Sequence, residues 1–427
     1  MNFYTNEYFD IGYNTKKLHA NRLFDNIKKI DISYHADSIN SFINFCCCEV
    51  ESNELKSNLE ILEKKMIQDD YQILKSTLLH HCCCDTSLVR HCLELIEYLI
   101  NSDTNIEYKS VKDDDENYRF NKQDLQCATT PFFEAARCGA IEICKLLLNK
   151  GANINTRRAS DNRGILHEIV SGSGYDIIPI LRFFVENGAD VKAIDKDKIS
   201  ILGVAAQYGD YEVCRLLIEE WNADVNPLKV RQPINYAIKN GHIDVIRLLV
   251  DHGASISLNH CAAAITSDSE RRTEVLRLLL EKSNITNLNK KINSDGHTLL
   301  TLSAAYGYTE CCRVLVSRGA NIETKSSQGC TPLLNAVRYA IYNNKSTACA
   351  RTLLELGANI DSKDSISRTP LFFAIMNLCD YADLEVVKML LKFGASVHHA
   401  TEDGYQALHC AAFDIVSDDE TFSDSER

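Results

Sequence analysis

Hydrophobic positions along this chain gather in short helical stretches that recur with a period of about 33 residues. Each stretch carries apolar residues at three-to-four spacing, which is typical of a helix with one buried face. A second apolar stretch follows, as in residues 141–149, and ends at a glycine such as Gly151. Threonine caps helices, proline suits the first helical turn, and glycine ends helices. The pattern therefore predicts a cap, a short helix, a turn, a longer helix, a glycine stop and an extended finger.

Two recurring phrases carry this pattern. The opening phrase holds four of the six prolines and reads Thr130-Pro131-Phe132, Gln232-Pro233-Ile234, Thr331-Pro332-Leu333 and Thr369-Pro370-Leu371. The closing phrase starts at Gly151, Gly188, Gly253, Gly319, Gly357 and Gly394, with Asn222-Ala223-Asp224-Val225 as a variant without the glycine. Together they resemble the ankyrin repeat, whose hallmarks are T-P-L-H-x-A-A and L-L-x-x-G-A-D/N. The resemblance implies an all-α repeat solenoid of helix-turn-helix units with β-hairpin-like fingers.

The register of the opening phrase predicts the organisation of the chain. Marks fall at residues 130, 164, 200, 232, 298, 331, 369 and 406, and the double interval after 232 predicts a worn fifth repeat. Longer repeats carry their extra residues between the two helices. We expect a helical N-terminal segment (1–70), a degenerate repeat (71–107), a polar mixed-charge insertion (108–126), eight repeats (127–401), a truncated repeat (402–413) and a disordered acidic tail (414–427).

Composition narrows the function classes. The net charge of −13 argues against nucleic acid as the main partner. The chain has no 18-residue apolar run and no signal-peptide pattern, so we expect no membrane insertion and a cytoplasmic location, with the nucleus left open. The incomplete repeat at 402–413 leaves open that the chain is a fragment of a longer protein.

The 18 cysteines do not predict disulfides or zinc. Cys144, Cys214 and Cys312 fall at equivalent places on second helices, where a free thiol acts as a small buried apolar group. In the run His80-His81-Cys82-Cys83-Cys84, consecutive helical residues point in successive directions and cannot converge on one metal. We expect no metal and no cofactor. The alternatives, a metal site here or acylation at Cys46-Cys47-Cys48, are weaker interpretations.

No catalytic motif is present, and we expect no enzyme and no small-molecule substrate. The chain lacks G-x-S-x-G, H-E-x-x-H, the P-loop and G-x-G-x-x-G. His167 and His409 match the histidine of T-P-L-H, and the resemblance implies that they form hydrogen bonds within the repeat stack.

Aromatic residues mark the candidate binding surface. The resemblance implies that first helices and fingers line a concave face. Tyr208, Tyr306 and Tyr339 lie eight residues after their register marks, and Tyr236 and Phe373 lie four after theirs. Aromatic side chains are enriched where partners bind. The alternative is that these rings only pack between adjacent helices.

Charge adds a second expectation. The N-terminal fingers carry an excess of basic residues, among them Arg157, Arg158 and Lys196, whereas the later fingers are neutral or acidic. We expect a partner to place its acidic part there, the alternative being solvated finger tips without a role.

The sequence therefore predicts a protein-binding scaffold or adaptor without enzymatic activity. Two alternatives remain: a substrate-recognition subunit of a ubiquitin ligase, and a targeting or regulatory part of a larger enzyme or channel.

Overall fold

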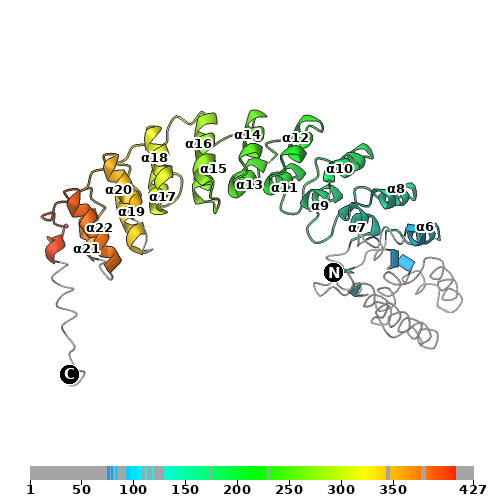
Figure 1. The fold of residues 1–427 in the computed structure, drawn as a ribbon, viewed down its shortest axis with the longest axis horizontal. Coiled ribbons are helices and arrows are strands. Elements are labelled where there is room, and N and C mark those ends of the chain that lie inside the picture. Colours follow the sequence, from blue (N-terminus) through cyan, green and yellow to red (C-terminus); the bar gives the residue numbers. More distant parts are fainter. Residues whose placement is uncertain are drawn as a thin grey trace, which may run out of the picture. The chain divides into compact units, whose positions relative to one another are not determined.

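Paired helices and short fingers build the chain. The computed structural model describes residues 75–76, 78–79, 83, 93–102, 104–107, 111–112, 118–119, 129–172, 176–227, 231–342, 347–376 and 381–409. In the longer of these stretches, each pair of helices is followed by a finger that leads to the next pair (Figure 1). The predicted all-α repeat fold is confirmed.

The chain divides into two compact units, which we describe separately. The first comprises Met1–Ala205 and Glu212–Arg231, and the second Ala206–Tyr211 and Gln232–Arg427. The first unit contains α6 (Leu93–Asn101), α7 (Pro131–Arg137), α8 (Ile141–Asn149), α9 (Ile165–Ser171), α10 (Ile177–Glu186), most of α11 (Ile201–Tyr208) and nearly all of α12 (Tyr211–Glu219). The strands β1 (Val111–Lys112) and β2 (Tyr118–Arg119) pair antiparallel inside the predicted insertion.

The second unit continues the same order of helix pairs. It contains α13 (Pro233–Asn240), α14 (Ile243–Asp251), α15 (Leu258–Thr266), α16 (Arg272–Lys282), α17 (Leu299–Ala305), α18 (Thr309–Ser317), α19 (Pro332–Tyr342), α20 (Ala348–Glu355), α21 (Pro370–Met376) and α22 (Tyr381–Lys392). The pair α15/α16 occupies the position where we predicted a worn repeat.

Several expectations lie outside the described residues. These are the helical N-terminal segment 1–70, the acidic tail 414–427, the run Cys46-Cys47-Cys48 and most of the cluster at 80–84. The boundaries proposed for the separate segments stay predictions.

The opening phrase starts the first helices as predicted. Thr130 is the N-cap of α7, where its side chain accepts a hydrogen bond from the Phe133 N–H at 3.3 Å, and Pro131 is the first helical residue. Thr369 accepts in the same way from the Phe372 N–H at 3.2 Å. A side-chain oxygen at this position satisfies a backbone N–H that the helix itself leaves free.

The closing phrase ends the second helices. In α8 the N–H of Gly151, whose φ is 91°, donates to Leu148, and the N–H of Ala152 donates to Leu147. This pair of bonds is the Schellman ending, which requires a left-handed residue. Asn222 takes the same position in the variant phrase with a φ of 51°. Asparagine tolerates this conformation better than most other residues, so the variant ends its helix without glycine.

The core lies between successive helix pairs. Cys144, Cys214 and Cys312 are fully buried, as the register predicted. Burial raises the pKa of the Cys144 thiol above its ordinary value, and it raises the pKa of Cys261 to about 12. These thiols stay protonated and unreactive near neutral pH. Cys312 and Cys349 form no disulfide, although their Sγ atoms lie 3.7 Å apart.

Side chains in several fingers bind the backbone of the next repeat. The N–H of Asn321 donates to Asn289 Oδ1 at 2.8 Å, and the N–H of Asn359 donates to Glu323 Oε1 at 2.7 Å. The first unit repeats the contact between the N–H of Asp190 and Asn155 Oδ1 at 3.0 Å. Asn155 and Glu323 each lie four residues after the closing glycine of their repeat. A side-chain oxygen at this position thus keeps adjacent fingers in register.

Backbone groups at the finger tips form a second set of contacts. The N–H of Ser327 donates to Asp295 O at 2.8 Å, and the N–H of Ser365 donates to Gln328 O at 3.1 Å. The first unit has the equivalent bond from the N–H of Lys196 to Asp161 O at 2.7 Å. These fingers therefore supply hydrogen-bond partners to the next finger, as strands do in a sheet.

Gly329 tests how closely these fingers must approach. Its φ is 72°, and a Cβ there would lie 2.5 Å from the backbone nitrogen of Ser365. We expect Gly329→Ala to lower the free energy of unfolding by about 1 kcal/mol for the left-handed backbone plus about 1–3 kcal/mol for the backbone clash. Denaturant unfolding checks this.

The matched control is Gly319→Ala, where φ is 86° and no heavy atom lies within 4 Å of the added Cβ. It should show only the backbone cost. Equal losses in the two variants would contradict the close finger contact.

Candidate protein-binding surface

Tyrosines stand exposed at the ends of first helices in the second unit. Tyr208, the last residue of α11, is 56% exposed, and Tyr306, the C-cap of α17, is 43% exposed. Each is followed by a left-handed glycine, Gly209 or Gly307, that turns the chain toward the second helix. The tyrosine ring at the end of each of these two helices therefore lies outside the core.

Tyr306 belongs to a small aromatic group. Its ring stacks on Tyr308 with centroids 5.7 Å apart and an interplanar angle of 6°. Arg272 lies over the other ring of this stack, with its guanidinium carbon 4.1 Å from the Tyr308 centroid. Tyr339, half-exposed, lies against Gly307, where an added Cβ would be 2.1 Å from its Cε1. These contacts hold the rings in a fixed orientation.

The equivalent position at the end of α13 is used differently. Asn240 ends α13, and its Nδ2 donates to the carbonyls of Gln207 at 3.0 Å and Tyr236 at 3.1 Å. His242 contacts the same Gln207 carbonyl through Nε2 at 3.0 Å. Tyr236 itself is half-exposed. The position thus carries a bridge between repeats here and an exposed ring elsewhere.

Phe373 is a correction to the expected set. It is only 4% exposed, so its ring offers no surface to a partner. Tyr342 meets it edge-on at 5.9 Å, and the guanidinium carbons of Arg338 and Arg368 each lie 5.5 Å from its centroid. The alternative interpretation, packing between adjacent helices, holds for this residue.

The basic fingers of the first unit are largely paired within the unit. Arg158 Nη2 lies 2.6 Å from Asp161 Oδ2 and 2.8 Å from Glu168 Oε1. Burial raises the pKa of the Glu168 carboxyl, against the opposing effect of Arg158 and Arg163. The hydrogen bond from Arg158 holds the pKa of Asp161 below its ordinary value although burial acts to raise it. Reversing Arg158 would remove the closer ion-pair partner of both carboxylates and leave them only Arg163, at 3.9 Å from each, so the charge of Arg158 serves the fold.

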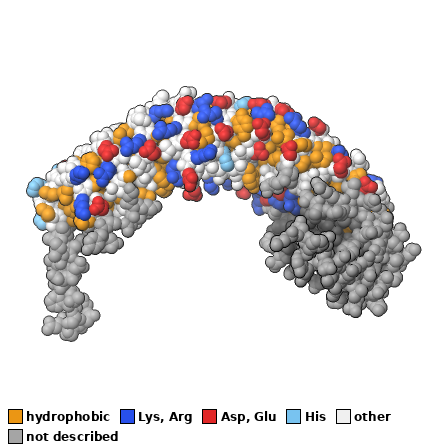
Figure 2. Space-filling view, viewed as in Figure 1, with side chains coloured by type: hydrophobic (Ala, Val, Ile, Leu, Met, Phe, Trp, Pro, Cys, Tyr) orange, Lys and Arg blue, Asp and Glu red, His pale blue; other side chains and the backbone are white. Residues whose placement is uncertain are grey.

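Arg157 and Lys196 are more available. Arg157 Nη1 donates to Ile194 O at 2.9 Å, and Nη2 lies 3.6 Å from Asp190 Oδ2. The Lys196 side chain is exposed. On the face drawn in Figure 2, basic and acidic side chains alternate over the described helices.

The histidines of the repeat register serve structure. His167 is fully buried on α9, and its Nε2 lies 3.2 Å from Ile199 O in the next finger. His260 and His409 accept through Nδ1 from the N–H of the residue three before them, Ser257 at 3.1 Å and Gln406 at 2.9 Å. Within the described residues, no group of three or more His, Cys, Asp or Glu side chains is arranged to hold a metal ion.

The sequence interpretation missed Arg338 and Tyr342. Both lie on α19, which has 11 residues, whereas α17 in the preceding repeat has 7. Tyr342 is 63% exposed on the added turn. The longer spacing between the opening threonine and the closing glycine of this repeat indicated extra residues. The prediction assigned them to the turn between the helices, whereas the structure has some of them in the first helix, α19.

Taken together, helix pairs, Schellman endings and interlocking fingers define an α-helical repeat protein whose first-helix ends and fingers remain accessible. The family model for ankyrin repeats (three copies) matches residues 43–158, 166–260, 260–364 and 338–417. The chain therefore belongs to the ankyrin-repeat family, a family of protein-interaction modules.

Three curated relatives show how far the similarity reaches. Ankyrin repeat and KH domain-containing protein mask-1 of Caenorhabditis elegans is 27% identical over 200 residues, which is 47% of this chain and 7% of the relative. Putative ankyrin repeat protein FPV031 of Fowlpox virus (strain NVSL) is 24% identical over 195 residues, 44% of this chain and 52% of the relative. Palmitoyltransferase ZDHHC13 of Mus musculus is 30% identical over 97 residues, 21% of this chain and 15% of the relative.

The chain thus spans between 7% and 52% of the length of these relatives.

Among the described residues, none of the helices is long and apolar enough to cross a membrane.

His167 predicts a pH effect on stability. Burial lowers its pKa below its ordinary value, while the Ile199 carbonyl and Asp195 act to raise it and Arg163 and Arg157 act to lower it. The unfolded chain therefore takes up a proton below pH about 6.5, before the folded chain does. The stability contribution is complete above that pH and is lost as pH falls through the folded pKa.

His167→Gln should remove this contribution. The free energy of unfolding of the wild type should fall more steeply than that of the variant as pH drops below about 6.5, with parallel curves above. Denaturant titrations at a series of pH values measure both. A variant that loses stability with acid as steeply as the wild type would refute the assignment.

Proposed function

We propose that this chain is a non-enzymatic cytoplasmic scaffold or adaptor that binds a partner protein with the ends of its first helices and its fingers. The observation that carries the proposal is the exposure of Tyr208 and Tyr306 at equivalent helix ends. The second helices, by contrast, direct their apolar residues into the core, as Val213, Cys214 and Leu217 do in α12. The ends of the first helices thus offer exposed rings to a partner, although second helices also expose Tyr211 in α12 and Leu384 and Leu391 in α22.

The physics of interfaces supports this choice. A tyrosine ring buries a large area with few rotatable bonds, and its hydroxyl finds a polar partner at the rim. Tyr308 already orients the Tyr306 ring, and Gly307 lies against the Tyr339 ring. These two side chains would therefore lose little conformational entropy when a partner binds. Binding to such a surface needs no change in the stacked helix pairs.

A second candidate is a targeting or regulatory part of a larger enzyme or channel. It is favoured by the small share of the longer relatives that this chain covers, as with the 15% of a palmitoyltransferase. In that case the same surface would bind another part of the larger assembly. Co-purification of a catalytic or membrane component in fixed stoichiometry would distinguish it from a free-standing adaptor.

Replacing the exposed rings should weaken partner binding. We expect Tyr208→Ala with Tyr306→Ala to reduce affinity for a partner captured from the native cell by about 30-fold or more, as for interface residues that contribute about 2 kcal/mol or more. The measurement is calorimetry with the purified partner.

The control is Leu391→Ala, which removes a large exposed side chain, 47% accessible, from the second helix α22, outside the proposed surface. It should leave the affinity within about twofold of wild type. Unchanged binding in the double variant, with unfolding midpoints equal to wild type, would refute the proposed surface.

Charge reversal tests the role of the basic fingers. Arg157→Glu with Lys196→Glu should slow association with the partner, and the difference from wild type should shrink as salt rises, because exposed charges act mainly through screened steering. Stopped-flow kinetics at several ionic strengths measure it. Lys150→Glu, an exposed cap of α8, is the control. Equal salt dependence in the wild type and the double variant would rule out an acidic contact at these fingers.

A further inference from the structure

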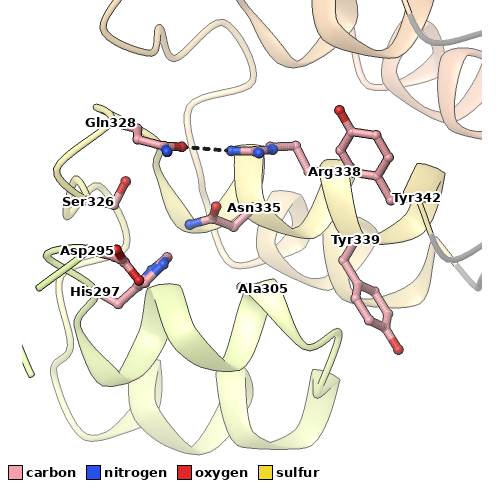
Figure 3. A pocket seen from close by; sticks show the side chains of 9 residues that line it. All are labelled: Asp295, His297, Ala305, Ser326, Gln328, Asn335, Arg338, Tyr339 and Tyr342. Carbon is pink, nitrogen blue, oxygen red and sulfur yellow. Dashed lines mark hydrogen bonds between the residues drawn. The ribbon is translucent and has the colours of Figure 1, made fainter. Parts of the chain in front are cut away.

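A polar pocket lies on the first-helix side of the second unit. It has a volume of about 390 Å³ and is lined by Asp295, His297, Ala305, Ser326, Gln328, Asn335, Arg338, Tyr339 and Tyr342 (Figure 3). Two fingers and the helices α17 and α19 contribute these residues. Cavities of this size hold small ligands or a few side chains of a partner.

Arg338 supplies the positive charge of the pocket. Its Nη1 donates to Gln328 Oε1 at 3.1 Å, and in the described part of the chain its Nε and Nη2 make no hydrogen bond and no carboxylate pairs with it. The guanidinium carbon lies 5.5 Å from the centroid of the buried Phe373 ring. The guanidinium is thus held in place while its remaining donors stay available.

Asn335 adds a second donor. The residue is 6% exposed, and among the described residues its Nδ2 has no hydrogen-bond partner. In Figure 3 its amide points from α19 across the pocket toward Ser326, Asp295 and His297. A buried amide donor without a partner is unfavourable, so an acceptor entering the pocket would relieve it.

The walls limit the kinds of group that fit. Asp295 is the one acidic side chain among the lining residues, and it is exposed at the side opposite Arg338 (Figure 3). Burial lowers the pKa of His297, which is therefore neutral near pH 7. On the other side, Tyr342 is 63% exposed and meets Phe373 edge-on, and Tyr339 lies against Gly307. Free donors next to aromatic rings suit a short carboxylate side chain with an aliphatic stem.

We propose that this pocket receives an aspartate or glutamate side chain from an extended segment of the partner, with Arg338 as the charged donor and Tyr339 and Tyr342 against its aliphatic stem. The inference rests on the proposed function, because it takes the ligand to be a protein. Phe373 acts here as a positioning residue, since it holds the Arg338 guanidinium and the Tyr342 ring without touching the ligand. A wholly buried ring at this position thereby contributes to binding indirectly.

The test uses a random peptide library displayed on phage and selected on the full chain. We expect the selected peptides to share one acidic residue at a constant position. Synthetic versions should bind Arg338→Gln about 10- to 100-fold more weakly than wild type, as for a lost hydrogen bond to a charged group. Replacing the acidic residue of the peptide by its amide should weaken binding to the wild type by a similar factor but have little further effect in Arg338→Gln.

Two further variants keep the test valid if Arg338→Gln disturbs the fold. Arg338→Lys retains the charge and should retain the preference for the acidic residue over its amide, at lower affinity. Arg351→Gln removes an exposed arginine of α20 that does not line the pocket and should bind as wild type does.

The outcomes separate this inference from the proposed function. Selected peptides that lack a shared acidic residue, or that bind Arg338→Gln and wild type equally, would refute the pocket and leave the protein-binding function standing. Failure to select any peptide would refute the pocket as a site for an extended segment, and the function would then depend on the tyrosine variants. Loss of partner capture together with failure of selection would count against both.

Discussion

The structure depends on hydrogen bonds that each repeat can complete only with its neighbour. The N–H of Asn359 finds its acceptor in Glu323, and the N–H of Ser365 finds its acceptor in Gln328, both in the preceding finger. These bonds are exposed to solvent, so each contributes only about 0.5–1.5 kcal/mol, but a finger that slipped out of register would lose several of them at once. The buried faces of the second helices add the same requirement, because one helix pair cannot cover its own apolar side. Period and register therefore follow from the need for adjacent partners.

This constraint also leaves one side of the repeats free. Buried residues of the second helices, such as Leu147, pack between repeats, and Schellman hydrogen bonds end these helices. The ends of the first helices have a structural role in some repeats only. That freedom explains why one position holds Asn240 as a bridge and Tyr306 as an exposed ring. Extra residues between the helices act in the same way. They lengthen α19 by a turn and so build one wall of the pocket around Arg338. Variation on this side thus changes the proposed binding surface without disturbing the stack.

Much of the fold followed from local chemistry that a sequence displays directly. The threonine cap at Thr130, the glycine ending at Gly151 and the buried Cys144 each depend on residues within a few positions, and all three were predicted. The candidate site was harder, because exposure is decided between repeats. Phe373 shares its register with Tyr236, yet Arg338 and Tyr342 cover it from the preceding repeat. Arg158 likewise forms an ion pair with Glu168. Glu168 lies on α9 and not in the finger, so a count of charges in the finger does not include it.

The central claim is that the ends of the first helices and the fingers, rather than the second helices, meet the partner. Amide hydrogen exchange of the full chain, with and without a purified partner, tests it most directly because it reports every region at once. The account predicts slower exchange in peptides that cover the end of α11, the α17–α18 turn around Tyr306 and the start of α19 through Tyr342. Protection confined to second helices such as α12, α14 and α18, with these regions unchanged, would contradict it.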